Sequence, residues 1–463
     1  MHKVVKFTIT SLLCLLTVFV SASPALAAGP PETDAAAVLL VEGVSGTVLF
    51  SENKDVRRSP DTLVKIMTLL LAVEACDSGT VSRQDVVTAA DSAFFDITEQ
   101  SSNQKITPGE DLTFIDLMYC AFLGSANEAC NIIAEHVSGS VGAFVNEMNL
   151  RAASLGCKDT LFTNTHGQVD AGQYTTAWEL YLIYSAAMEN PGFAEISRAL
   201  QYKTSATNKS DVRSLTNTNY LLSENSRYYY KLCTGGKPSA TYENGYAFVG
   251  SSEYENMQLF SVLLGTKAIT LEDNSTLMRN LSDARALMAW GFESFEWKTI
   301  LSDGELITKI PVKHGDGADF VNLRPVDSIT ILTPVNTDRS DFERVIRLFP
   351  EERGEELVAP VKNGDVLGEI TLKKDGKSYG TVKLVANTDV KLLHIKYIES
   401  RVLEVLSSRI VKIIIIAIIV LFAGYIFLLV RYNRHRRAKR KRIEEAKAKI
   451  IEDRRRTEHS EKF

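Results

Sequence analysis

Thr62 and Lys65 are side chains whose types and spacing could do chemistry. They lie three residues apart, so on a helix they share a face and the hydroxyl lies beside the amine. In the first turn of a helix the backbone N–H groups have no intrahelical partner and can hold an oxyanion. A hydroxyl beside an amine is a nucleophile with its own base. The pair predicts covalent catalysis, although T-x-x-K also fits a capped helix with a snorkelling lysine.

The helix expected to carry this pair has its own start signals. Ser59, Pro60 and Asp61 supply a capping residue, a first-turn proline and a first-turn carboxylate. Residues 63–73 continue without a breaker, and their apolar side chains cover nearly every side, which predicts a buried helix. An ammonium at Lys65 would be costly there, so Lys65 is expected to be partnered or partly neutral.

Several segments resemble one family, in that family's order. Residues 62–68, TLVKIMT, resemble the S-x-x-K segment of the serine-type D-alanyl-D-alanine carboxypeptidases, the low-molecular-weight penicillin-binding proteins. Residues 125–127, Ser-Ala-Asn, resemble the family's S-x-N region. Residues 162–167, FTNTHG, and 174–177, YTTA, are similar to the stretch that follows it. The resemblance covers residues 38–265.

The resemblance implies a role for each matching residue. Thr62 would be the nucleophile and Lys65 the general base. Ser125 would relay a proton, and Asn127 would hold the substrate amide. Ser125 and Asn127 could instead simply cap the helix that follows them.

The family's third element, K-T-G on an edge strand, is assigned to Cys233, Thr234 and Gly235 as substrate-binding residues. Thr234 would face the terminal carboxylate of the peptide, and Gly235 would let strand and substrate approach closely. Cysteine in place of lysine removes a cation that attracts this carboxylate. Lys231 and Lys237 lie nearby and are candidates to compensate in part.

Threonine in place of serine at position 62 is a second departure from the family pattern. It keeps a hydroxyl but adds a methyl group that restricts its rotamers, so a lower rate is expected. His166 is interpreted as a loop hydrogen-bonder and Cys233 as a small buried side chain. A nucleophilic Cys233 has no base that the sequence identifies.

The fold class expected is an α/β (α+β) penicillin-binding or transpeptidase-like domain with a second, small all-β domain and a C-terminal transmembrane helix. Short alternating runs across residues 297–393 and a turn at Asp375 and Gly376 predict the β-domain. Residues 359–365, APVKNGD, resemble the family's own C-terminal domain. In the first domain we expect strands within 38–50, at 246–250 and at 259–265, and helices at 112–122, 127–136, 141–155 and 176–188.

The two ends of the chain read as targeting and anchoring segments. Residues 1–27 have a basic start, an apolar run and a small-residue ending, as in a cleaved secretory signal. A nearly continuous apolar stretch begins at Ile410, ends at Val430 and is long enough to cross a membrane. Basic residues follow at once, which predicts a single-pass protein with an extracytoplasmic N-terminal body and a cytoplasmic tail. The expected segments are 1–27, 28–292, 293–393, a connector at 394–409, the membrane helix at 410–430 and the tail at 431–463.

Charge and cysteine usage limit the partners. The formal net charge of -5 conceals a basic tail, so the rest of the chain is acidic and a nucleic-acid partner is not expected. The six cysteines, one of them in the signal, show no metal-ligand spacing, so neither a zinc site nor a disulfide framework is assigned, although one bridge stays open. No metal or organic cofactor is implied.

The resemblance implies a carboxypeptidase that acts on peptidoglycan stem peptides through an acyl-enzyme on Thr62, with β-lactams as further candidate ligands. The altered positions 62 and 233 motivate an alternative. In that alternative, an impaired relative binds cell-wall peptide, or serves as a scaffold, at the membrane.

Overall fold

The computed structural model describes residues 29–267, 269–270 and 276–460. Its internal contacts divide the chain into two compact units. The first runs to Lys298 and includes Ile331–Asp338, and the second comprises Thr299–Thr330 and the chain from Arg339 onward. The predicted secretory signal lies outside the described residues.

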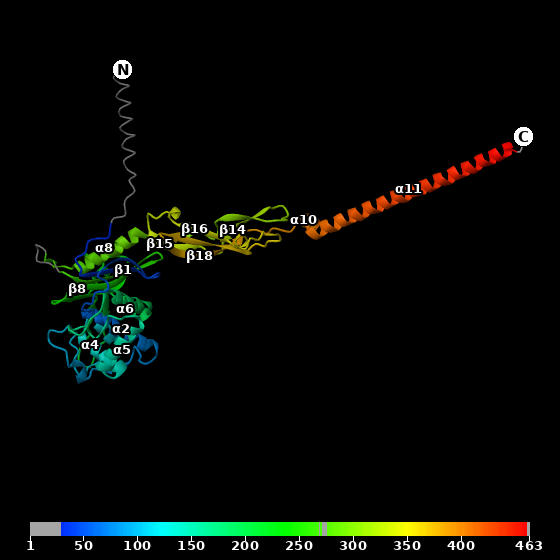
Figure 1. Ribbon diagram of the computed structural model, residues 1–463. Helices are drawn as coiled ribbons and strands as arrows, with labels where there is room; N and C mark the ends of the chain where they lie inside the picture. Colours follow the sequence, from blue (N-terminus) through cyan, green and yellow to red (C-terminus); the bar gives the residue numbers. More distant parts are fainter. Residues whose placement is uncertain (1–28, 268, 271–275, 461–463) are drawn as a thin grey trace, which may run out of the picture. The chain divides into compact units, whose positions relative to one another are not determined.

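A five-stranded antiparallel sheet, in the order β2-β1-β9-β8-β7, forms the centre of the first unit (Figure 1). Strands β1 (Ala37–Glu42) and β2 (Thr47–Glu52) form the hairpin that the sequence predicts. Strands β8 (Gly245–Tyr254) and β9 (Met257–Thr266) form a second hairpin. Strand β7 (Cys233–Thr241) pairs only with β8, so one of its edges is left free to face the site described below.

Successive side chains of each strand point to opposite faces of this sheet, and an apolar core covers each face. Ala37, Leu39 and Val41 of β1 belong to one apolar core, whereas Val38 and Leu40 belong to another. The second core is completed by α8 (Arg279–Ser294), which lies on the opposite side of the sheet from α2 and α6 (Figure 1). The first core contains α2 (Val64–Asp77), α3 (Phe114–Phe122), α4 (Asn127–Ser138), α5 (Val141–Ser154), α6 (Ala177–Glu189) and α7 (Pro191–Arg198).

The predicted helices are confirmed with small changes at their ends. The segment expected to be helical from residue 112 begins as strand β4 (Asp111–Thr113), which pairs with β3 (Val86–Thr88). Helix α3 then starts where the Thr113 hydroxyl accepts a hydrogen bond from the Asp116 amide. Further short elements are β5 (Gln201–Lys203), β6 (Ser214–Thr216), β10 (Ile269–Thr270) and β11 (Thr276–Leu277).

The second unit is built on another five-stranded antiparallel sheet, in the order β13-β14-β18-β17-β16. Strands β17 and β18 form a hairpin that turns at Asp375 and Gly376, both with positive φ, as the sequence predicts. The strands are β13 (Thr308–Pro311), β14 (Phe320–Pro325), β16 (Glu343–Leu348), β17 (Val366–Lys374) and β18 (Lys377–Ala386), with one short helix, α9 (Phe349–Glu352). Strands β12 (Phe295–Leu301) and β15 (Ile329–Pro334) pair in a separate ladder.

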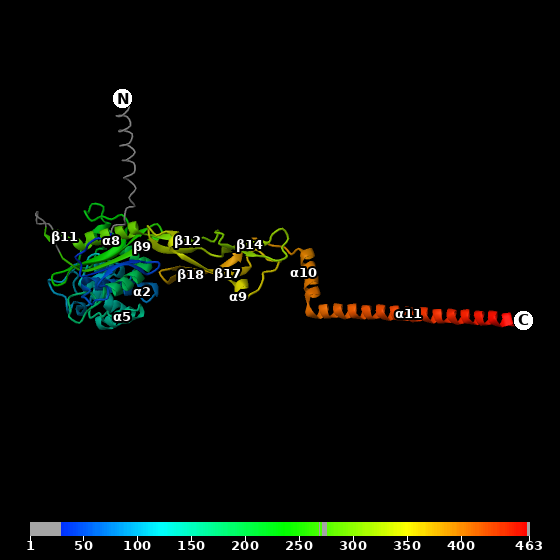
Figure 2. The same cartoon turned by 45° about the horizontal axis from the view of Figure 1, so that its top comes forward.

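Two helices end the described chain: α10 (His394–Ser407) and α11 (Arg409–Ser460) (Figure 2). Helix α11 contains the predicted apolar stretch, with a mean hydropathy of 3.3 over its most apolar window. It is the one helix in the described part of the chain that is long and apolar enough to cross a membrane.

Candidate active site

Thr62 lies in a single 3₁₀ turn, Asp61–Leu63, that leads directly into α2. Asp61 adopts a positive φ of 47°, and its buried carboxylate accepts hydrogen bonds from Ser59 Oγ at 2.8 Å and Asn244 Nδ2 at 2.7 Å. Ser59 was predicted to cap the helix. Its hydroxyl instead binds the Asp61 carboxylate. Burial raises the pKa of Asp61. The Asn244 contact attaches the turn to the β7–β8 hairpin.

Gly167 packs against the backbone of this turn. A Cβ atom at Gly167 would lie 1.8 Å from the carbonyl oxygen of Asp61, and the residue has a φ of 83°. Only glycine fits both conditions. The backbone next to Thr62 is thus held from the side of the FTNTHG segment.

Lys65 is buried in the first turn of α2, with only 1% of its surface exposed. Its ammonium donates to Asn127 Oδ1 at 2.8 Å and to the carbonyl oxygen of His166 at 2.5 Å. Desolvation lowers its pKa, because burial disfavours the charged form. The predicted need for partners is confirmed, and an amine with a lowered pKa can accept a proton.

Ser125 and Asn127 lie where α3 gives way to α4. Ala126 is the N-cap residue of α4 and makes no side-chain capping bond, and Ser125 has a positive φ of 53°. Neither side chain caps the helix, so the capping alternative does not hold. Ser125 lines a cavity together with Thr62, and Asn127 holds Lys65.

His166 is held by a carboxylate that the sequence analysis did not single out. Its Nε2 lies 2.9 Å from Asp96 Oδ2, and its Nδ1 accepts from the amide of Gln168 at 3.2 Å. With Nδ1 as an acceptor, Nε2 carries the proton and donates it to Asp96. Burial lowers the pKa of His166, which favours the neutral ring. The Asp96–His166 pair positions the His166 carbonyl that binds Lys65.

Cys233, Thr234 and Gly235 lie at the start of β7 and contact residues other than Thr62. The Thr234 hydroxyl lies 2.8 Å from Ser251 Oγ. A Cβ at Gly235 would meet Ser197 Oγ at 2.6 Å. Burial raises the pKa of Cys233 to about 11, which argues against a reactive thiolate.

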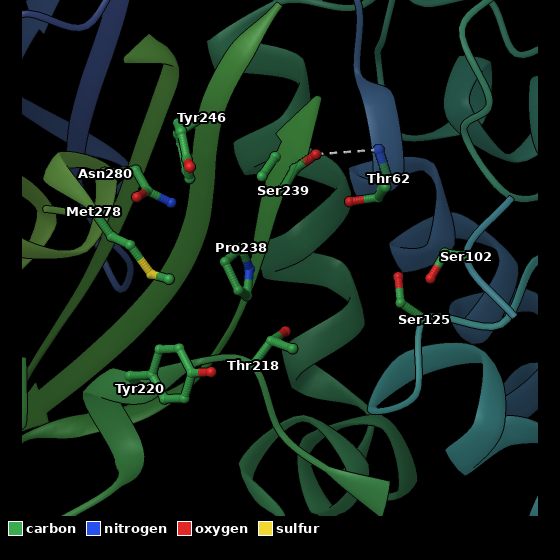
Figure 3. A pocket seen from close by; sticks show the side chains of 11 residues that line it. Thr62, Ser102, Ser125, Thr218, Tyr220, Pro238, Ser239, Tyr246, Met278 and Asn280 are labelled. Atoms are coloured by element: carbon green, nitrogen blue, oxygen red, sulfur yellow. Dashed lines mark hydrogen bonds between the residues drawn. The ribbon is translucent and has the colours of Figure 1, made fainter. Parts of the chain in front are cut away.

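Farther along β7, Pro238 and Ser239 lie close to Thr62. Ser239 Oγ accepts a hydrogen bond from the Thr62 amide at 3.3 Å, and Pro238 and Ser239 line the same cavity as Thr62 (Figure 3). Lys237 precedes them with 2% of its surface exposed. Its ammonium donates to the Phe122 carbonyl at 2.6 Å. Burial, and then the charge of Lys65, lower the pKa of Lys237 to about 7.

Two cavities flank Thr62. The first, of about 280 Å³, has only uncharged lining residues, with Ser102 and Ser125 on the Thr62 side and Pro238 and Ser239 on β7 (Figure 3). The second, of about 600 Å³, is reached by Asn127 and Gly167 and has one charged lining residue, Glu243. The arrangement suits a peptide that lies along the free edge of β7 with a carbonyl at Thr62.

The described residues contain neither a cluster of metal-ligand side chains nor a disulfide bond. No group of three or more His, Cys, Asp or Glu side chains there is arranged to hold a metal ion. The five cysteines that the structure describes are all unpaired, so the disulfide that the sequence left open is not formed.

Comparisons with known proteins agree with this geometry. The family model described as D-alanyl-D-alanine carboxypeptidase matches residues 24–268, more than half of the chain. The chain belongs to the D-alanyl-D-alanine carboxypeptidase family. A second model, described as the C-terminal domain of penicillin-binding protein 5, matches residues 295–392.

Individual family members match along most of their length. D-alanyl-D-alanine carboxypeptidase DacA of Escherichia coli is 31% identical, covering 83% of this chain and 92% of that protein. DacF of Bacillus subtilis is 28% identical, covering 77% and 86%. Among solved structures, penicillin-binding protein 5 of Haemophilus influenzae has 28% identity and a TM-score of 0.57, covering 79% of this chain and 99% of that one.

The two lysine- or cysteine-led triplets on β7, residues 233–235 and 237–239, make different contacts. The sequence analysis assigned the K-T-G triplet to residues 233–235, but the Thr234 hydroxyl contacts Ser251 and Gly235 packs against Ser197. Pro238 and Ser239, four residues farther along β7, line the Thr62 cavity instead, and Lys237 directly precedes them.

Proposed function

We propose that this chain is a D-alanyl-D-alanine carboxypeptidase that releases the terminal D-alanine of peptidoglycan stem peptides. One observation carries the proposal: Thr62 and Ser125 share a cavity, and Lys65 is buried one helical turn beyond Thr62 with a lowered pKa. Hydroxyl, amine and relay hydroxyl are the groups that acyl transfer needs. The comparisons match carboxypeptidases and do not favour the non-catalytic alternative.

In the proposed reaction, Thr62 Oγ1 attacks the carbonyl carbon of the penultimate D-alanine while Lys65 takes its proton. The carbonyl oxygen becomes an oxyanion near the backbone amide of Thr62. The C–N bond then breaks, Ser125 passes the proton to the leaving amine, and D-alanine departs. Water, deprotonated by Lys65, hydrolyses the ester and restores the Thr62 hydroxyl. A β-lactam would acylate Thr62 in the same way through its ring carbonyl.

Substrate contacts on the other side of the cleft are assigned to Asn127 and β7. We propose that Lys237, with Pro238 and Ser239, takes the place of the family's K-T-G triplet. The structural support is that Pro238 and Ser239 line the Thr62 cavity and that Lys237 directly precedes them. Lys237, when its amine is protonated, would supply the cation for the substrate carboxylate.

We also propose a membrane-anchored topology. A secretory signal at residues 1–27 would export a catalytic domain (28–292) and a β-domain (293–393). A connector (394–409) would then lead to a membrane helix (410–430) and a cytoplasmic tail (431–463). The long apolar stretch in α11 and the basic residues after it support this arrangement.

The test is release of D-alanine from diacetyl-L-lysyl-D-alanyl-D-alanine by the full-length protein in detergent. Lys65→Ala and Thr62→Ala should each abolish release, because removing either member of such a pair costs a factor of about 10³ or more. Thr163→Ala outside the cleft is the matched control. Release that persists in Thr62→Ala would exclude Thr62 as the nucleophile, and no release by the native protein would exclude the proposed activity.

A further inference from the structure

The amide of Thr62 is bound across the cleft by a side chain. Its N–H donates to Ser239 Oγ at 3.3 Å, and Ser239 lies 177 positions later in the chain (Figure 3). The next two amides of the turn are bonded within it, Leu63 to the Pro60 carbonyl and Val64 to the Asp61 carbonyl. Of these three backbone amides, that of Thr62 is the one that faces the cleft.

That donor has a predictable use in acyl transfer. When a side-chain hydroxyl attacks a carbonyl, the oxyanion forms near the backbone N–H of the nucleophilic residue itself. Donors aimed at this point contribute strongly to the rate, and losing one costs a factor of about 10² to 10³. The Ser239 hydroxyl occupies the place where the carbonyl oxygen of a substrate would accept from Thr62.

We propose that Ser239 is a gating residue, whose hydroxyl fills the oxyanion position of the resting enzyme and has to rotate away before Thr62 can be acylated. This inference rests on the proposed function. The backbone of Ser239 is fixed, because β7 pairs with β8 in the register Ser239↔Ala247. The Cβ atom therefore stays in place, and rotation about χ1 is the movement left to the side chain.

A single neutral hydrogen bond of 3.3 Å makes this gate easy to displace. A substrate that is held along the cleft by several contacts can offset the loss of the Ser239 bond with binding energy from its other parts. A small acylating agent has fewer such contacts. The gate therefore selects for extended peptides over small reactive carbonyl compounds, including β-lactams.

The test compares Ser239→Ala, which removes the hydroxyl and keeps the Cβ, with Ser239→Thr, which keeps a hydroxyl. Full-length proteins in detergent are acylated by a fluorescent penicillin, and tripeptide hydrolysis is followed in parallel. Ser239→Ala should raise the acylation rate by about five- to tenfold, the gain from freeing one donor from a neutral hydrogen bond. Ser239→Thr should stay at or below the native rate. Ser154→Ala on α5 is the matched control and should match the native protein.

A second measurement follows the contact itself. Amide hydrogen exchange at Thr62, resolved by fragmentation, should be faster in Ser239→Ala than in the native protein and in Ser154→Ala. Faster acylation together with faster exchange supports the gate. An acylation rate that is unchanged or lower in Ser239→Ala, with the native protein active, overturns it.

The two proposals fail in different ways. If no variant is acylated and none hydrolyses the tripeptide, the proposed function is wrong. In that case, amide hydrogen exchange at Thr62 that is unchanged in Ser239→Ala would also exclude the Ser239–Thr62 hydrogen bond. Faster exchange would show that this hydrogen bond exists in a site that binds but does not catalyse.

Discussion

The ammonium nitrogen of Lys65 lies 2.8 Å from Oδ1 of Asn127, and both side chains are buried. A neutral amide oxygen can accept this hydrogen bond without supplying a negative charge. Burial therefore dominates, and the pKa of Lys65 is lowered. The pair keeps the amine in place while leaving it able to lose its proton.

Asn127→Asp should move the pH profile of acylation to higher pH. A carboxylate beside the ammonium favours the charged form, so it raises the pKa of Lys65. The base acts only when neutral, so the limb of the profile that rises with pH shifts in the alkaline direction. The measurement is the rate of penicillin acylation from pH 5 to 10, with Asn363→Asp in the β-domain as the control. An unshifted limb in Asn127→Asp would show that Lys65 is not the titrating base.

Lys237→Met should change how stability depends on pH. The pKa of Lys237 is lowered from 10.5 to about 7, so between these values the unfolded chain binds more protons than the folded one. The stability of the native protein therefore rises with pH across this window relative to the variant, which lacks the group. Urea unfolding at pH 7, 8 and 9 measures the difference. Lys231→Met, at an exposed position, is the control, and a difference that does not change with pH would contradict a lowered pKa.

Lys65 and its partners show what the sequence could and could not predict. Thr62, Lys65, Ser125 and Asn127 could be named as candidates because each lies in a short segment with a characteristic local spacing. Asp96 was missed, because it lies 70 positions before His166 and no local pattern joins the two. Such a pair is visible only once the chain has folded.

The register of β7 that we propose differs from the one inferred from the sequence, for a related reason. Residues 233–235 contain Thr-Gly, whereas residues 237–239 keep only the lysine of K-T-G, so composition favoured the earlier triplet. Which triplet reaches Thr62 depends on pairing with β8 and on the packing of the Asp61–Leu63 turn, which are long-range contacts.

Thr62→Ser should raise acylation by about tenfold. The γ-methyl group of threonine limits its χ1 rotamers and occupies space where the carbonyl must approach. Serine keeps the oxygen and regains the rotamers. The fluorescent-penicillin assay measures the rate, with Thr163→Ser as the control. A slower Thr62→Ser variant would mean that the methyl group helps to hold the hydroxyl in its reactive position.

Gly167→Ala should lower both stability and activity. The added Cβ would lie 1.8 Å from the Asp61 carbonyl oxygen, so the turn that carries Thr62 has to move, and the φ of 83° is strained for alanine as well. We expect a loss of about 2–4 kcal/mol in the free energy of unfolding. Gly139→Ala separates the effect of the steric clash from the effect of the backbone strain. Gly139 has a similar φ of 77° at the end of α4, but its Cβ would meet nothing within 4 Å.

Gly139→Ala should therefore cost only about 1 kcal/mol and leave acylation unchanged, because strain acts there without a clash. Thermal unfolding and penicillin acylation of both variants give the comparison. Equal losses in the two variants would show that backbone strain alone matters at Gly167. A larger loss of stability and of acylation in Gly167→Ala would show that contact with Asp61 holds the Thr62 turn in its reactive geometry.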